Sequence, residues 1–283
     1  MINTYNIHGT VNFDQNPCFN FKETYPNFQN DLEKFKSDLI EMVNNKESKT
    51  FFKFGDGDYF FLKKQSVGSA SPGKRALSKN YADLNFEYFE NGSKSNDYYT
   101  CEIYPENRKM FQEVFPHFNI DYPAEYGYGL VSNKWFFNTF KGKIGLIGGK
   151  EKIELIKKLM EYEEYQNYLN IDKFNDYIHI PQKYACDDLE TVEKNIAEQL
   201  KNSTSDIFLL GIGHVKSGLT HRLKKYKNSV FFDIGSGIDA IAGIIDINRP
   251  YFGNWVNYQI KNDEIYNKLD FLNYNGLGSH KFL

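Results

Sequence analysis

The sequence predicts an α/β protein with a Rossmann-like, mostly parallel sheet that carries helices on both faces. Segments typical of strands and of helices alternate along most of the 283 residues. Such alternation is typical of βαβ units, whose crossover helices cover both faces of a parallel sheet. Glycines follow several predicted strands, as expected where a strand turns into a helix and ligands bind. We therefore expect one α/β body.

The first predicted helix begins near Asn30, where Glu33 completes a capping box. A strand at Thr50–Phe52 follows. The other predicted strands are Tyr98–Ile103, Tyr128–Val131, Lys143–Ile147, Tyr177–Ile180, Asp206–Leu210 and Ser229–Phe232. The other predicted helices are Ala76–Glu90, Glu106–Phe115, Lys134–Phe140, Glu151–Tyr162, Leu189–Leu200 and Val215–Tyr226.

The chain divides by pattern into three parts. Residues 1–29 lack periodicity and are predicted to be an N-terminal surface segment. Residues 30–248 hold the alternating elements of the α/β domain. Residues 249–283 are irregular in pattern and are expected to be a tail that packs on the same domain.

Composition argues against several classes of function. The net charge is −3, and no basic cluster exceeds Arg222-Leu223-Lys224-Lys225, so we expect no nucleic-acid partner. Cys18, Cys101 and Cys186 lie far apart, which excludes a C-x₂-C metal site and argues against a disulfide framework. No signal-peptide pattern and no apolar run of about 18 residues is present. We expect a cytoplasmic protein, free or peripheral at a membrane, whose oligomeric state stays open.

The most informative motif follows the strand at Thr50–Phe52. It reads Lys53-Phe54-Gly55-Asp56-Gly57-Asp58. Two carboxylates in a glycine-containing loop are suited to Mg²⁺ or Mn²⁺ and a diphosphate, because hard cations prefer oxygen ligands and glycine lets the backbone approach a ligand. Asp-Gly is also a common hairpin turn, and a second strand at Tyr59–Leu62 is the competing interpretation.

Two further glycine-containing segments follow predicted strands. The first holds Gly211, Gly213 and His214, and the second reads Asp233-Ile234-Gly235-Ser236-Gly237. Neither matches the dinucleotide or P-loop pattern, so neither an NAD site nor an NTPase is supported. The second is similar to the glycine-rich loop of S-adenosylmethionine methyltransferases, an alternative that would require a permuted fold.

Several charged residues could act at such a site. Lys74 and Arg75, in a small-residue loop with Ser69, could pair with a diphosphate or form a solvated helix start. His214 could be a base or a phosphate ligand, or a polar loop residue. Asp239 could be a general base, or a carboxylate that interacts with a helix dipole.

Taken together, these segments resemble the GT-D family of glycosyltransferases over roughly residues 30 to 245. That family has a strand ending in Arg-Phe-Gly-Asp-Gly-Glu, a later Leu-Gly turn, and an Asp-Ile-Gly-His-x-Asp segment. The counterparts here are the Lys53 motif, Leu209-Leu210-Gly211-Ile212-Gly213 and Asp233-Ile234-Gly235-Ser236-Gly237-Ile238-Asp239. This chain has Lys53 for the leading arginine, Asp58 for glutamate, and Ser236-Gly237 where the histidine is expected.

The resemblance implies transfer of a sugar from a nucleotide-diphosphate donor, with a UDP-sugar favoured, to a glycan hydroxyl with inversion. It implies Mn²⁺ or Mg²⁺ on Asp58 and Asp56. The implied base is Asp239, with His214 as the second candidate catalytic residue. The implied donor contacts are Lys53, Gly55, Asp56, Gly57, Ser69, Lys74, Arg75, Gly211, Gly213 and Asp233. A methyltransferase, a non-catalytic glycan-binding module and a dinucleotide-dependent sugar-nucleotide epimerase remain alternatives.

Overall fold

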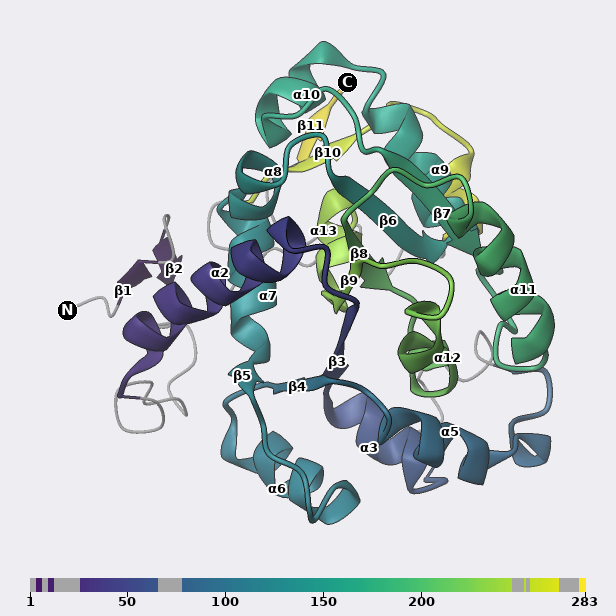
Figure 1. The fold of residues 1–283 in the computed structure, drawn as a ribbon. Helices are drawn as coiled ribbons and strands as arrows, with labels where there is room; N and C mark the ends of the chain where they lie inside the picture. The colour runs from purple at the N-terminus through teal and green to yellow at the C-terminus, as the bar shows by residue number, and fades with distance from the viewer. Residues whose placement is uncertain are drawn as a thin grey trace.

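The computed structural model describes residues 4–6, 10–12, 26–65, 78–245, 252, 255–269 and 280–283. At its centre lies a seven-stranded sheet in the order β5-β4-β3-β9-β8-β6-β7, in which every pairing is parallel (Figure 1). The strands are β3 (Lys49–Phe54), β4 (Tyr98–Cys101), β5 (Tyr122–Pro123), β6 (Ile144–Gly149), β7 (Asp176–Ile180), β8 (Ile207–Gly211) and β9 (Val230–Asp233). The predicted fold class is confirmed.

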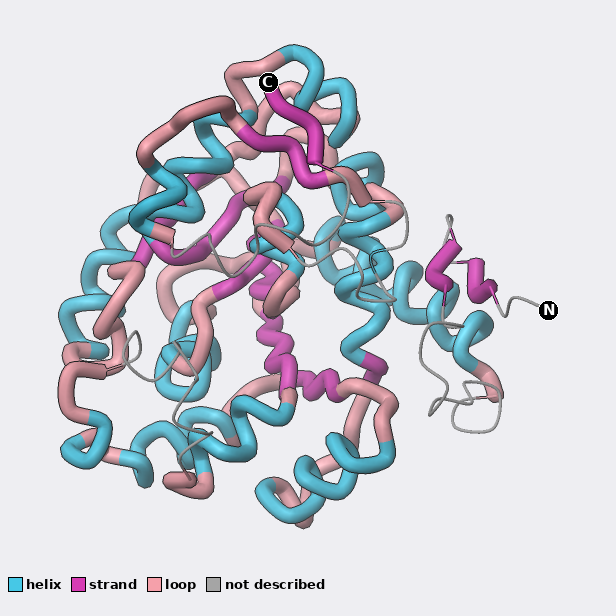
Figure 2. The backbone as a smooth tube through the Cα atoms, turned by 180° about the vertical axis from the view of Figure 1, so that it is seen from behind, coloured by secondary structure: helices cyan, strands magenta, loops and turns pink. Residues whose placement is uncertain are grey.

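Helices cover both faces of the sheet, as the two views of the backbone show (Figures 1 and 2). One core contains side chains of α2 (Phe28–Asn44), α7 (Ala124–Ser132), α8 (Trp135–Thr139), α9 (Lys150–Leu159), α10 (Glu163–Leu169) and α13 (Gly237–Ile241). The other contains side chains of α3 (Asp56–Leu62), α5 (Phe86–Ser93), α6 (Pro105–Val114), α11 (Leu189–Leu200) and α12 (Val215–Leu223). Successive side chains of a central strand enter the two cores in turn. In β8, Leu209 packs into the first core, and Phe208 and Leu210 pack into the second.

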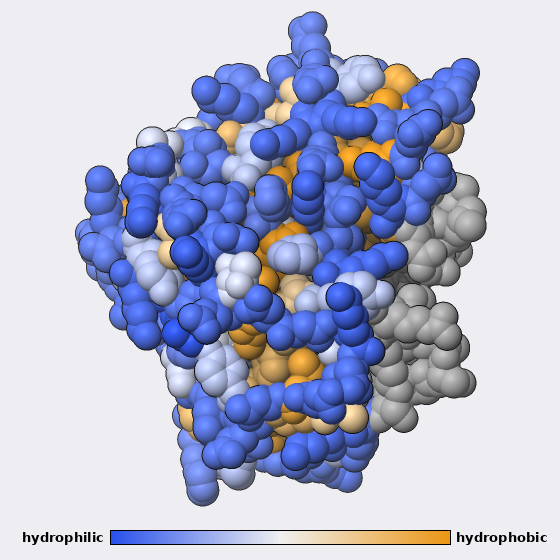
Figure 3. Space-filling model, turned by 90° about the vertical axis from the view of Figure 1, so that its right-hand side faces the viewer, coloured by the Kyte–Doolittle hydropathy of each residue, from blue (hydrophilic) through white to orange (hydrophobic). Residues whose placement is uncertain are grey.

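The remaining described elements lie outside the main sheet. They are the antiparallel pair β1 (Thr4–Asn6) and β2 (Thr10–Asn12), η1 (Tyr81–Asp83), the parallel pair β10 (Asn257–Gln259) and β11 (His280–Phe282), and α14 (Ile265–Lys268). None of the described helices is both long and apolar enough to cross a membrane. On the face shown in Figure 3, hydrophilic residues predominate and apolar residues show between them. The division of the chain at residues 29 and 248 stays a prediction.

Adjacent strands β3 and β9 send the chain to opposite faces of the sheet. After β3, α3 packs into the second core through Phe61 and Leu62. After β9, α13 packs into the first core through Ile238 and Ile241. Such a switch opens a crevice at the carboxyl ends of the two strands, which is where open α/β sheets bind ligands. The topology therefore locates the candidate site at the ends of β3 and β9.

One predicted strand is wrong. Tyr128–Val131 belongs to helix α7, and the edge strand of this region is the short β5. Residues 124–131 are all buried, so this helix has no polar face, and the 3.6-residue pattern that marks a surface helix is absent. A short apolar run cannot be assigned to strand or helix by periodicity alone.

Gly92 sets the close approach of α5 to α12. A β-carbon at this position would meet the backbone carbonyl oxygen of Ser217, which cannot move without shifting α12. We expect Gly92→Ala to lower the free energy of unfolding by about 2 kcal/mol, because overpacking outweighs the gain in helix propensity. Urea denaturation measures this, with the exposed neighbour Asn91→Ala as the control. Equal stability of the two variants would contradict the close packing.

Candidate functional site

The site begins where β3 passes into α3. Gly55 has an extended backbone (φ −140°, ψ 177°) and is the N-cap of the helix. Its N–H donates to Oδ2 of Asp58 over 2.9 Å, so a carboxylate in the first turn satisfies a free N–H and faces the positive end of the helix dipole. The competing prediction of a hairpin into a strand at Tyr59–Leu62 is wrong, because these residues continue the helix.

Lys216 lies at the centre of the site. Its Nζ is 3.0 Å from Oδ2 of Asp58 and 3.0 Å from Oδ2 of Asp233, and it also donates to the backbone carbonyl of Lys53. Its side chain is only 7% exposed, and the ammonium lies 4.8 Å from the ring centroid of Phe52. One buried cation from α12 therefore joins α3 to the ends of β3 and β9.

His214 contacts the other oxygen of the same carboxylate. Its Nδ1 lies 3.2 Å from Oδ1 of Asp58, and its ring stacks on Phe61 with 4.7 Å between centroids. Burial alone would raise the pKa of Asp58, but the charge of Lys216 and the hydrogen bond from His214 outweigh burial and lower this pKa below its ordinary range. The ionised carboxylate holds the proton on Nδ1, which leaves Nε2 of His214 as the acceptor.

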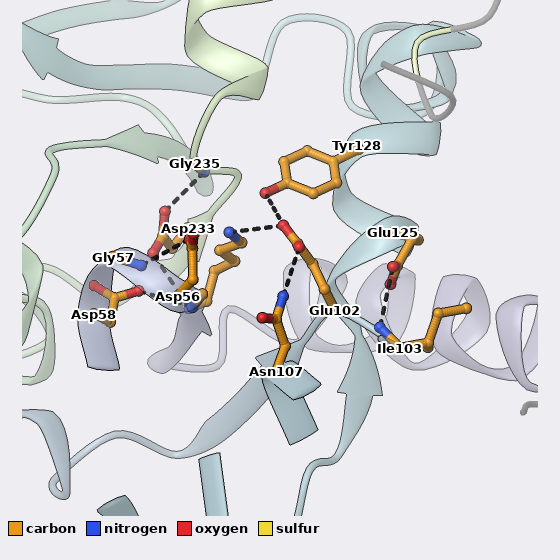
Figure 4. A network of polar contacts seen from close by, with 12 residues as sticks. Asp56, Gly57, Asp58, Glu102, Ile103, Asn107, Glu125, Tyr128, Asp233 and Gly235 are labelled. Carbon is orange, nitrogen blue, oxygen red and sulfur yellow. Dashed lines mark hydrogen bonds and ion pairs between the residues drawn. The ribbon is translucent and has the colours of Figure 1, made fainter. Parts of the chain in front are cut away.

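Asp233 fixes the loop after β9. Its Oδ1 accepts the N–H of Gly235 over 2.8 Å, and its Oδ2 accepts the N–H of Lys53 over 3.2 Å (Figure 4). Gly235 has a φ of +49°, a conformation that glycine adopts without steric cost. The carboxylate thus holds the turn after β9 against the end of β3.

The side chain of Lys53 extends toward β4. Its Nζ lies 3.1 Å from Oε1 of Glu102, which also accepts the hydroxyl of Tyr128 over 3.2 Å, while Oε2 accepts from Asn107 over 2.9 Å (Figure 4). Burial alone would lower the pKa of Lys53, but the charge of Glu102 raises this pKa well above its ordinary value. Lys53 is therefore a fixed cation at the end of β3.

A second glutamate lies behind this pair. Glu125 is 1% exposed and accepts the N–H of Ile103 over 3.1 Å (Figure 4). Burial, with the neighbouring charge of Glu102, raises the pKa of Glu125 to about 8. At neutral pH this carboxyl group is mostly protonated, so it adds no full negative charge to the site.

The structure brings most of the predicted site residues within the described chain to one edge of the sheet. These are Lys53, Gly55, Gly57, Asp58, Gly211, Gly213, His214 and Asp233. Asp56 is exposed and accepts the N–H of Gly57 over 2.7 Å. Asp239 instead forms an ion pair of 2.5 Å with Lys152 of α9. Ser69, Lys74 and Arg75 lie outside the described residues. The functional roles of all these residues stay predictions.

Sequence reasoning did not single out Lys216, Glu102, Tyr128 or Glu125. One signal was present for Lys216, which lies in the first turn of α12. A cation at that end of a helix is opposed by the helix dipole, so such a lysine needs carboxylate partners nearby. Nothing in the sequence pattern marked the two glutamates, because their partners come from distant segments.

The metal assignment does not fit the donor atoms. Both oxygens of Asp58 already have partners: the N–H of Gly55, Lys216 and His214. Among the described residues, no group of three or more His, Cys, Asp or Glu side chains could hold a metal ion. Mn²⁺ or Mg²⁺ on Asp58 and Asp56 remains a prediction for experiment, and no step of the proposed reaction depends on it.

A separate groove lies beside α5, α11 and α12. It has a volume of about 520 Å³, and its lining includes Tyr88, Cys186, Glu193 and Arg222. None of its lining residues belongs to the network around Lys216. The charged network around Lys216 and this groove therefore lie in different parts of the described structure.

Comparison with known proteins gives one structural likeness. No family model matches this chain, and no curated protein matches it in sequence. Its structure is similar to a solved structure described as "A New Glycosyltransferase (DUF1792) from Streptococcus sanguinis". The two share 12% sequence identity with a TM-score of 0.49, over 82% of this chain and 95% of that chain. At this level the likeness supports no argument about the site.

Proposed function

We propose that this protein transfers a sugar from a nucleotide-diphosphate donor, a UDP-sugar in the first instance, to a hydroxyl of a glycan. The observation that carries the proposal is the meeting of Lys53, Asp58, His214 and Asp233 at the crevice between β3 and β9. Lys53, Asp58 and Asp233 come from segments that resemble the GT-D family, and His214 directly follows the remaining one, which ends at Gly213. The same edge is the usual ligand-binding edge of an open parallel sheet.

His214 is the proposed general base. Asp58 orients the ring through Nδ1, and the side chain is 23% exposed, so Nε2 is available to take a proton from the acceptor hydroxyl. The deprotonated hydroxyl attacks the anomeric carbon opposite the leaving nucleotide, which inverts the configuration. Asp239 is less suited to this role, because Lys152 neutralises it.

Lys53 is the proposed contact to the diphosphate. Its ammonium lies beside Gly55, where a β-carbon would be 2.8 Å from Nζ, so the absence of a side chain leaves room for the cation at the crevice. Fixed positive charge stabilises the negative charge that develops on the leaving diphosphate. Gly211, Gly213, Asp233, Ser69, Lys74 and Arg75 complete the proposed donor site.

We expect His214→Ala to lower kcat by roughly 10²- to 10⁴-fold and to change the affinity for UDP by less than about threefold. The assay measures turnover of UDP-sugars with oligosaccharide acceptors, and UDP binding by calorimetry. His179→Ala is the control, because His179 is exposed on the edge strand β7. Full activity of His214→Ala would remove this base from the mechanism.

A ligand screen separates the proposal from its alternatives. UDP, GDP, CMP and S-adenosylmethionine are compared by thermal shift, since selective binding stabilises the folded state. A shift with S-adenosylmethionine alone would indicate a methyltransferase. Nucleotide binding without turnover of any sugar-nucleotide would indicate a binding module.

A substitution at Gly57 tests whether the acceptor can reach Nε2 of His214 without lowering the stability of the fold. A β-carbon there would lie 3.4 Å from Cε1 and 3.7 Å from Nε2 of His214, which is ordinary contact. We expect Gly57→Ala to keep or raise the melting temperature, because alanine favours helix α3, and to lower kcat by roughly tenfold by crowding Nε2. Differential scanning fluorimetry and the turnover assay measure the two effects. Unchanged kcat would show that the acceptor does not approach His214 from this side.

A further inference from the structure

Two buried carboxylates share one cation in the crevice. Asp58 and Asp233 are 4% and 3% exposed, and Oδ2 of each faces the same Nζ of Lys216 at 3.0 Å. The backbone carbonyl of Lys53 is the third acceptor. Two carboxylate oxygens and a carbonyl oxygen form a donor set that a hard divalent cation also prefers. The ammonium of Lys216 therefore occupies a place with the ligand chemistry of a metal site.

Three oxygen atoms surround the ammonium of Lys216. A lysine ammonium has three N–H donors. Here Nζ of Lys216 donates to the backbone carbonyl of Lys53 and forms ion pairs with Asp58 and Asp233. The side chain is 7% exposed, and burying an unpaired ammonium is costly. The helix dipole of α12 also opposes a cation in its first turn. Lys216 is held in this position by the two carboxylates.

A metal ion and this ammonium exclude each other. The second oxygen of Asp58 is engaged by His214, and the second oxygen of Asp233 by the N–H of Gly235. A cation bound to either Oδ2 at about 2.1 Å would lie within roughly 5 Å of Nζ in a buried environment, where like charges repel strongly. For a metal to bind, Lys216 must leave its three acceptors.

We propose that Lys216 is the resident cation of the Asp58–Asp233 pair and takes the place of a divalent metal. Lys216 is then a positioning residue: its ammonium holds both carboxylates in place, so that Asp58 orients His214 and Asp233 holds the loop of Gly235. The donor diphosphate is bound without a metal at Asp58. This last step rests on the proposed function, whereas the exclusion of a metal does not.

Mn²⁺ binding to the protein alone tests the exclusion, by electron paramagnetic resonance of free Mn²⁺ during titration. We expect the wild type and Asp58→Asn to show the same weak binding. Lys216→Met is expected to bind Mn²⁺ at least roughly tenfold more tightly than the wild type, and the added change Asp58→Asn to abolish this gain. Lys224→Met is the matched control, because Lys224 of the same region pairs with a single carboxylate, Asp97.

Two results would overturn the proposal. One is a saturable Mn²⁺ site in the wild type that Asp58→Asn removes. The other is a folded Lys216→Met variant that binds no more Mn²⁺ than Lys224→Met. If Lys216→Met does not fold, the proposal is tested by comparing Mn²⁺ binding of the wild type with that of Asp58→Asn.

UDP binding tests the functional part. We expect the same rise in the wild-type melting temperature with UDP in EDTA and in Mn²⁺. A rise that occurs with Mn²⁺ only would overturn metal-free binding of the diphosphate. If neither UDP nor any other nucleotide binds, the proposed function fails, and the Mn²⁺ titration still decides whether Lys216 replaces a metal.

Discussion

Asp233→Ala is expected to lower the free energy of unfolding by about 3 kcal/mol. The carboxylate is 3% exposed and has three partners: Lys216, the N–H of Lys53 and the N–H of Gly235. Its loss removes one of the two charges that neutralise a buried ammonium and leaves two backbone N–H groups without their acceptor. Breaking a buried ion pair from one side is among the most destabilising single changes.

Equilibrium urea denaturation measures this loss. Asp206→Ala is the matched control, because Asp206 lies just before β8 and its side chain has no hydrogen bond or ion pair with the described residues. The control is expected to change the free energy of unfolding by less than about 0.5 kcal/mol. Equal stability of the two variants would mean that Asp233 does not hold the network together.

Glu125 is expected to make the protein less stable as the pH rises. Its pKa is about 8 in the folded protein, against an ordinary value of 4.5. Below pH 4.5 the carboxyl group is protonated in both states. Between pH 4.5 and 8 only the folded state keeps the proton, so the free energy of unfolding falls by up to about 1.4 kcal/mol per pH unit. Above pH 8 this contribution is constant.

Glu125→Gln is expected to remove that slope. Glutamine does not ionise, and its carbonyl can still accept the N–H of Ile103. The variant should equal the wild type near pH 4 and exceed it in stability at pH 9, as measured by urea denaturation across this range. Glu87→Gln, an exposed change on α5, is the control and should keep the wild-type slope. A wild-type slope in Glu125→Gln would show that another group titrates.

The sequence predicted the sheet well because its central strands are short apolar runs between clear helices. The predicted strand at Asp206–Leu210 differs by one residue at each end from β8, and the helix Leu189–Leu200 has the same limits as α11. Errors arose where local signals conflict with tertiary structure. Tyr128–Val131 is apolar because α7 is buried on all sides. At Gly55 the turn signal of Asp-Gly was overridden by the bond from the Gly55 N–H to Asp58.

The site was predictable only where its residues stand in a motif. Asp58, His214 and Asp233 follow strands, so the rule for parallel sheets brings them together. Lys216 and Glu102 have their roles through partners more than 40 residues away in sequence, such as Asp58 for Lys216 and Lys53 for Glu102. A local sequence pattern does not indicate an ion pair between residues so far apart. The spacing of the residues also does not indicate that the ammonium of Lys216 lies at a position where a metal ion was predicted.

The pairing of β3 with β9 has a consequence for synthesis. The bond from the Lys53 N–H to Asp233 joins residues 180 positions apart. At 5 to 20 residues per second, β3 leaves the ribosome roughly 10 to 40 seconds before its central neighbour exists. During this interval β3 has an open inner edge, and for most of it Lys216, the ammonium partner of Asp58, is not yet synthesised. The crevice is therefore completed late, and we expect nascent chains that end before residue 230 to expose the edge of β3 that later pairs with β9.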